Sequence, residues 1–189
     1  KRNFILEDTV QRRTLEITWQ KEQIEEQKGI IEKKNKDITD SIRAAKYIQD
    51  AVLPPKQVLN SIFNDSFILY WPKDIVSGDF YWIKQVNQYI IVVVADCTGH
   101  GVPGAFMSML AMALMNEIVS KYHDIDPDSL LNELRSQIIE NLPQKGDPSA
   151  AKDGIDMVVC KIDRQNSRLL VAGANTSLYH VRDKVLNKY

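Results

Sequence analysis

The fold of this chain is decided by residues 77–105, which read SGDFYWIKQVNQYIIVVVADCTGHGVPGA. Residues 80–85 and 88–95 are rich in β-branched and aromatic side chains, and only two residues separate them. Two such runs joined by a very short connection predict a β-hairpin with its turn near Asn87.

Two aspartates flank this predicted hairpin at its open end. If the tight turn lies at Asn87-Gln88, Asp79 faces Asp96, with their Cβ atoms about 5 Å apart; a slip of one residue would separate them. Because like charges that face each other destabilise a sheet, something must neutralise them. Either a shared proton or a hard divalent cation such as Mg²⁺ or Mn²⁺ would do so.

The residues around the two aspartates favour the cation. Gly78 allows a close approach of the backbone, and residues 98–101 (TGHG) lead into an apolar helix that begins near Pro103. The amino terminus of such a helix offers N–H groups to an anion. These features together indicate metal-assisted attack on a phosphate group. The alternative is that the Asp and Gly residues only form turns at strand ends.

Composition excludes several other classes of protein. The 189 residues include 24 Lys and Arg against 25 Asp and Glu, a net charge of −1, which argues against binding to nucleic acid or to an anionic membrane. The longest apolar run, residues 104–115, is shorter than the roughly 20 residues that span a bilayer. Two cysteines form no disulfide framework, so we expect a cytoplasmic setting. The chain begins at Lys1 without a signal peptide, and we expect it to be part of a longer protein.

The chain divides by composition into two expected domains. Residues 1–53 carry 21 charged side chains, one glycine and no proline. This predicts a long helix that Pro54 and Pro55 end. Residues 54–189 contain all seven prolines and are expected to form the globular domain.

The long helix carries an apolar residue at every seventh position. The seam consists of Val10, Ile17, Ile24, Ile31, Ile38, Ala45 and Val52. A seven-residue repeat predicts a coiled coil, here a homodimer. Its companion positions are largely polar, so we expect weak pairing; a solvated single helix is the alternative. A fuller apolar face over residues 42–52 predicts that the helix end docks on the globular domain.

The globular domain is expected to be of the α+β class, because hairpins alternate with helices. Expected strands also cover residues 66–71, 156–163, 167–174 and 177–182, and expected helices cover residues 103–122 and 127–141. Residues 143–154 are expected to form a polar loop.

Residues 77–82 (SGDFYW) and 95–105 (ADCTGHGVPGA) together resemble the PPM-type metal-dependent serine/threonine phosphatases, in their SpoIIE-like bacterial branch. Residues 41–54 resemble the linker helix that precedes this domain in bacterial signalling proteins. Residues 153–157 and 172–175 resemble its middle strands. The resemblance implies an α-β-β-α sandwich with two Mn²⁺ or Mg²⁺ ions between the sheets.

The resemblance also implies roles for single residues. Asp79 and Asp96 would be carboxylate ligands, with Asp96 between the two metals, and Cys97 would contribute its backbone carbonyl. A metal-activated water would hydrolyse phosphoserine or phosphothreonine on a partner protein. His100 would protonate the leaving oxygen or only shape its loop. Residues expected to support the ligands or shape the loop are Gly78, Thr98, Gly99, Gly101 and Asp156. By its position in the sequence alone, Asp156 is either such a supporting acid or simply the first residue of a strand.

The family usually ends with two further aspartate motifs that complete the metal cluster. This chain stops at Tyr189 before either, so we expect weak metal binding and little activity from this part alone. Expected partners are a phosphorylated protein, a second copy through the helix and an upstream sensor, with no nucleic acid and no membrane segment. The alternatives are a non-catalytic phosphoprotein-binding domain or a dimerising transducer of the same fold.

Overall fold

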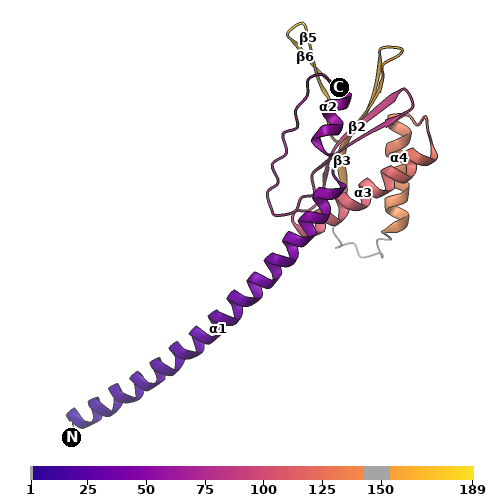
Figure 1. Ribbon diagram of the computed structural model, residues 1–189. Helices are drawn as coiled ribbons and strands as arrows, with labels where there is room; N and C mark the ends of the chain where they lie inside the picture. Colours follow the sequence, from indigo (N-terminus) through magenta and orange to yellow (C-terminus); the bar gives the residue numbers. More distant parts are fainter. Residues whose placement is uncertain (1, 143–153) are drawn as a thin grey trace. The chain divides into compact units, whose positions relative to one another are not determined.

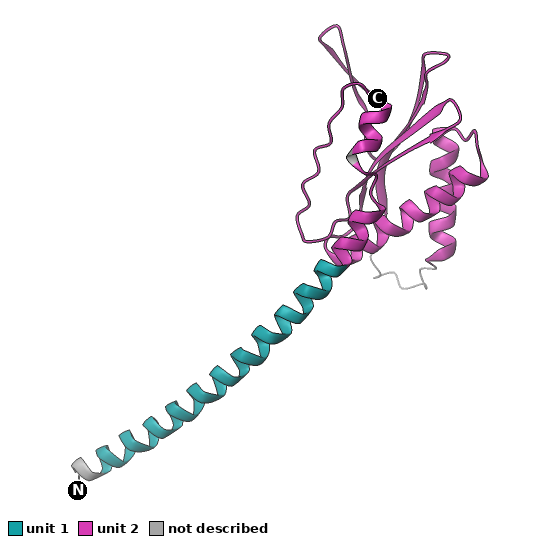
Figure 2. Ribbon diagram, viewed as in Figure 1, with its two compact units in different colours: residues 1–44 teal, residues 45–189 magenta. Residues whose placement is uncertain are grey.

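The computed structural model describes residues 2–142 and 154–189, and the chain forms two compact units, residues 1–44 and 45–189 (Figure 2). Its elements in chain order (Figure 1) are α1 (Arg2–Val52), α2 (Lys56–Ile62), β1 (Phe80–Val86), β2 (Tyr89–Cys97), α3 (Val102–Lys121), α4 (Pro127–Asn141), β3 (Ile155–Asp163), β4 (Arg168–Ala174), β5 (Tyr179–Arg182) and β6 (Val185–Lys188). The polar stretch predicted as a loop falls almost entirely outside the described residues.

The long helix α1 is unbroken over Arg2–Val52 and ends just before Pro54. The boundary between the compact units falls inside it, so residues 45–52 belong to the globular unit. Side chains of the predicted seam are exposed along the first unit, from 57% at Val10 and Ile31 to 63% at Ile17 and Ile24. The predicted dimer stays a prediction.

The end of α1 belongs to the globular unit, as predicted, but only part of the predicted apolar face is covered: Ala45 is half-buried. Ile48 and Val52 are 54% and 40% exposed, whereas Gln49 is only 2% exposed and Leu53, just past the helix, is 8% exposed. Residues four apart on a helix share one face. Docking therefore uses the narrow row that contains Gln49 and Leu53, and the polar member of that row is the more deeply buried.

The predicted hairpin and its register are confirmed. β1 pairs with β2 antiparallel, from Phe80 opposite Ala95 to Val86 opposite Tyr89. Asn87 in the turn has φ 55°, a left-handed conformation that asparagine tolerates better than most residues. The sheet continues in the order β1-β2-β3-β4 with every pair antiparallel, which confirms the α+β class.

Helices α3 and α4 pack on the same face of this sheet (Figure 1). The core between them contains the fully buried side chains of Val93, Met112, Met115, Ile118 and Leu130. By length and hydropathy alone, α3 is a weak candidate for a membrane-crossing helix. Ten of its 20 residues are buried within the protein, as expected for a core helix.

The prediction of a strand at residues 66–71 is wrong. This segment has no strand partner among the described residues, and Phe67, Leu69 and Trp71 are 82–90% exposed. An isolated extended segment gains no ladder hydrogen bonds, whatever its β propensity. The short helix α2 and the strand β6, which pairs with β5, were not predicted.

Candidate functional site

Two carboxylates meet at the open end of the first hairpin. Asp79 directly precedes β1, whose first residue is paired with Ala95, so the next position outward on β2 is Asp96. Both side chains are exposed and interact with one another. Partial desolvation raises the pKa of Asp79 above its ordinary value, and the hydrogen bond and charge repulsion from Asp96 raise it further. The two acids therefore share one face of the sheet.

A third acid continues the row across the sheet. Asp96 on β2 lies opposite Asp156 on β3 in an antiparallel pair, and residues directly opposite point to the same face. Asp156 accepts a hydrogen bond of 2.8 Å from Nδ2 of Asn175. Asp156 thus lies beside the carboxylate pair, and the uncharged side-chain amide of Asn175 donates a hydrogen bond to it.

Glycines allow the loops that carry the two acids to touch. A Cβ atom at Gly78 would lie 2.9 Å from the carbonyl oxygen of Cys97, and one at Gly104 would lie 2.6 Å from that of Gly99. Gly99 itself has φ 90°, which other residues rarely adopt. The approach of the Asp79 loop to the Asp96 loop and the start of α3 therefore requires glycine at these positions.

The loop after β2 is held at two points. Thr98 exchanges hydrogen bonds with Gly154: its Oγ1 donates to the carbonyl oxygen at 2.9 Å and accepts from the amide at 2.8 Å. Nδ1 of His100 lies 2.7 Å from Oδ2 of Asp74. Gly101, with φ 66°, is the residue directly before α3. The predicted loop residues are thus brought together at the mouth of the hairpin.

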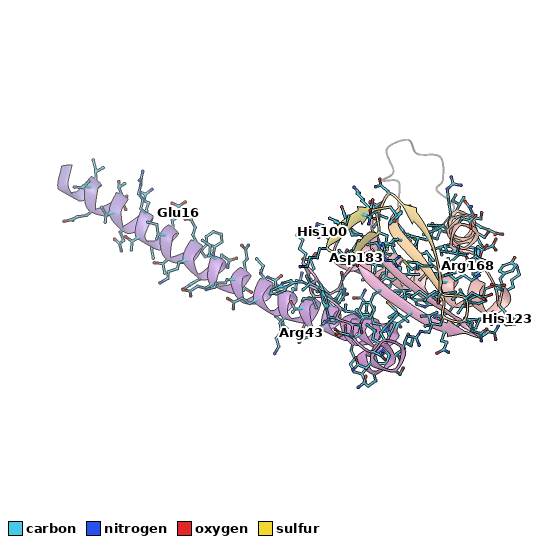
Figure 3. All side chains as sticks on the ribbon, turned by 90° about the horizontal axis from the view of Figure 1, so that it is seen from above. Glu16, Arg43, His100, His123, Arg168 and Asp183 are labelled. Carbon is cyan, nitrogen blue, oxygen red and sulfur yellow. The ribbon has the colours of Figure 1, made fainter. Side chains whose placement is uncertain are left out.

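His100 lines the same cavity as the two carboxylates. This cavity of about 190 Å³ is lined by Lys73, Asp74, Asp79, Asp96 and His100, among others. His123, which follows α3, lies at the far end of the globular unit (Figure 3). A second cavity of about 540 Å³ is lined by Asp79, Asp96, Asp156 and Thr176 beneath residues 65–71.

Cys97 ends β2 with its side chain in the core, 2% exposed. Burial raises the pKa of its thiol to about 12, and the charges of Asp96 and Asp79 add to the increase. The thiol is therefore protonated at neutral pH and unsuited to nucleophilic chemistry. Only its backbone carbonyl, which faces Gly78, is available to the site.

The oxygen ligands at this site are of the type that a hard divalent cation prefers, but there are too few side-chain ligands among the described residues to hold one. Two adjacent carboxylates with backbone carbonyls nearby are the oxygen ligands that Mg²⁺ and Mn²⁺ prefer. Within residues 2–142 and 154–189, no group of three or more His, Cys, Asp or Glu side chains converges closely enough to hold a metal ion. Asp153, part of the predicted motif at 153–157, lies outside the described residues.

Two polar residues that contact the site were not predicted from the sequence. Gln49 on α1 hydrogen-bonds the segment just before Asp79, and Asp74 holds His100. Asp74 stands in no local pattern that marks it out. The resemblance at residues 41–54 gave Gln49 no role, because its partners lie far away in the sequence.

Comparison with known proteins shows the family of this chain. The family model described as stage II sporulation protein E (SpoIIE) matches residues 87–187, slightly more than half of the chain. No curated protein matches significantly. Among solved structures, the SiaA-PP2C domain of Pseudomonas aeruginosa is 34% identical with a TM-score of 0.73, over 82% of this chain and 60% of that one.

Two further structures are more distant. The stage II sporulation E family protein from Thermanaerovibrio acidaminovorans is 15% identical over 57% of this chain and 51% of that one, with a TM-score of 0.46. The PPM Ser-Thr phosphatase MsPP from Mycobacterium smegmatis, in complex with cacodylate, is 18% identical over 60% of this chain and 46% of that one, with a TM-score of 0.44. The chain spans 60% of the length of the SiaA-PP2C domain structure. Its family match and its likeness to that domain show that this chain belongs to the SpoIIE family and has a phosphatase-type PPM fold.

Proposed function

We propose that this chain is part of a metal-dependent protein phosphatase that hydrolyses phosphoserine or phosphothreonine on a partner protein. One observation carries the proposal: Asp79 and Asp96 face each other at the mouth of the hairpin, where their mutual repulsion favours a bound cation. Membership of a family with a PPM fold supports the reaction class.

Different residues of this chain would bind the metal, donate a proton and attract the phosphate. Asp79, Asp96 and the carbonyl of Cys97 would hold Mn²⁺ or Mg²⁺, which would supply an activated water and stabilise charge on the phosphoryl group. Because Asp74 holds Nδ1 of His100, Nε2 would be the ring nitrogen that gives a proton to the departing serine or threonine oxygen. Lys73 in the same cavity would attract the phosphate.

The same proposal assigns a regulatory role to the long helix. The apolar seam of α1, which repeats every seven residues and is exposed along the first unit, would pair with the same seam of a second copy. An upstream sensor in a longer cytoplasmic protein would change that pairing. Locking the coil by disulfides in different registers in the complete protein should give different phosphatase rates. Equal rates in every register would refute this regulation.

The activity is tested in the complete protein with Asp96→Asn. We expect loss of Mn²⁺-dependent hydrolysis of a phosphoserine peptide, because the variant removes one charge from the cation site. Asp37→Asn, an exposed aspartate on α1, is the matched control and should keep the wild-type rate. Unchanged turnover by Asp96→Asn would refute the assignment.

A non-catalytic domain that binds phosphoproteins is the second candidate. It is favoured by the lack of a third converging ligand side chain among the described residues. Binding of a phosphopeptide to the complete wild-type protein, with no hydrolysis at any Mn²⁺ concentration, would establish this alternative.

A further inference from the structure

A buried polar side chain, that of Gln49, joins the helix α1 to the segment that carries Asp79. Gln49 is 2% exposed, in the part of α1 that belongs to the globular unit. Its Nε2 donates to the carbonyl oxygen of Ser77 at 2.7 Å and to Oγ of Ser108 at 3.0 Å. Its Oε1 accepts from the amide of Ser77 at 3.0 Å. Gln49 thus satisfies both backbone groups of one residue.

Ser77 needs this partner because the sheet does not supply one. β1 begins only at Phe80, so the buried backbone of Ser77, itself 5% exposed, has no strand ladder to join. A buried amide or carbonyl is costly when unpaired. The amide of Gln49 occupies the place that a neighbouring strand would take, and it comes from a helix 28 residues earlier in the chain.

The held segment leads directly to the carboxylate pair. Oγ of Ser77 accepts a hydrogen bond of 3.0 Å from the amide of Asp79. Between them, Gly78 packs against the carbonyl oxygens of Cys97 and Gly99, where even a Cβ atom would lie at 2.9 and 3.0 Å. The segment is therefore confined between Gln49 on one side and the Asp96 loop on the other. A shift of Ser77 cannot leave Asp79 unmoved relative to Asp96.

We infer that Gln49 is the positioning residue for Asp79, and that it makes the cation site depend on the seating of α1. This inference rests on the proposed function, because it concerns the same carboxylate pair. Without the amide of Gln49, the backbone amide of Ser77 loses its partner and the Ser77 carbonyl keeps only the hydroxyl of Ser108, so Asp79 no longer stays opposite Asp96. Ser108 on α3 shares the anchor, since its hydroxyl lies 3.2 Å from the same Ser77 carbonyl.

The test uses the 189-residue chain and the variant Gln49→Met, which keeps the side chain's length and removes its hydrogen bonds. Added Mn²⁺ broadens the NMR signals of nearby amides, so the broadening of Asp79 and Cys97 reports binding even when it is weak. Groups that orient ligands typically change metal affinity 10- to 100-fold. We expect Gln49→Met to need about 10-fold more Mn²⁺ for half-broadening.

A second readout is independent of the metal. The Asp79 amide bonds to Ser77 and not to Gln49, so faster hydrogen exchange at this amide would show that the disturbance spreads along the segment. We expect exchange roughly 10-fold faster in Gln49→Met, the change that corresponds to losing one ordinary hydrogen bond. Ile118→Val, a fully buried truncation elsewhere on α3, is the control for general destabilisation.

The outcomes separate the two proposals. If Gln49→Met and Ile118→Val have the same Mn²⁺ affinity and the same hydrogen-exchange rate at the Asp79 amide, the role of Gln49 is overturned. If wild-type signals do not broaden at any Mn²⁺ concentration, the metal site fails, while the exchange rate still decides whether Gln49 positions Asp79. If Gln49→Met does not fold, Ser108→Ala takes its place and should show a smaller change in the same direction; no change would overturn the inference.

Discussion

Replacing Asp79 by Asn should stabilise this chain at neutral pH without metal and leave it less stable than the wild type when Mn²⁺ is saturating. The register of β1 and β2, continued by one residue beyond Phe80 and Ala95, puts Asp79 opposite Asp96, and directly opposed residues have Cβ atoms about 5 Å apart. Two unit charges at that distance repel by about 0.8 kcal/mol in water and about 3 kcal/mol at an effective dielectric constant of 20. Because both side chains are exposed, we expect about 1 kcal/mol.

The pH dependence of this gain has a definite sign. The folded-state pKa of Asp79 is raised above its ordinary value of 3.8, by burial first and by Asp96 next. A raised carboxyl pKa means that ionisation disfavours the folded state. This penalty is absent below about pH 3.8, grows as the pH rises through the raised pKa and is complete above it. The advantage of Asp79→Asn should therefore be full at pH 7 and shrink toward pH 4.

Thermal unfolding in EDTA and in excess Mn²⁺ measures both effects. A gain of about 1 kcal/mol corresponds to about 2–4 °C in Tm for a unit of this size. At Mn²⁺ tenfold above the Kd, the wild type gains about 1.4 kcal/mol and Asp79→Asn gains little, so their order reverses. Asp37→Asn should change neither Tm nor its response to metal. Equal Tm values for Asp79→Asn and wild type in EDTA at pH 7 would refute the face-to-face charge pair.

Three further predictions follow from the same geometry. His100→Ala should slow hydrolysis of a phosphoserine peptide by about 100-fold or more in the complete protein, yet barely slow that of p-nitrophenyl phosphate, whose leaving group needs no proton; equal losses on both substrates would contradict a role as general acid. Gly104→Ala should cost about 1–3 kcal/mol in urea unfolding, since its Cβ would lie 2.6 Å from a carbonyl oxygen, whereas Gly29→Ala, with open space around it, should stabilise the helix by about 1 kcal/mol. Cys97, buried and with a pKa of about 12, should resist iodoacetamide at pH 8 in the native protein, as measured by mass spectrometry; alkylation as fast as in urea would show that the end of β2 is open.

The sequence by itself determined the elements whose signals are local. The two β-rich runs around Asn87 predicted the hairpin and its register, because a short turn leaves few ways to pair the strands. Pro127 and the polar stretch after Asn141 marked both ends of α4. The opposition of Asp79 and Asp96 followed from the same register, so the centre of the candidate site could be predicted before any tertiary contact was known.

Only the tertiary structure decided which side chains surround that centre. Gln49 meets Ser108 across 59 residues of chain, and Asp74 meets His100 across 26. Residues 66–71 have a strand's composition but no described partner, so they stay unpaired and exposed. In each case the structure depends on whether a partner far away in the sequence forms a hydrogen bond or a strand ladder with the segment. The periodicity within one segment carries no information about that partner.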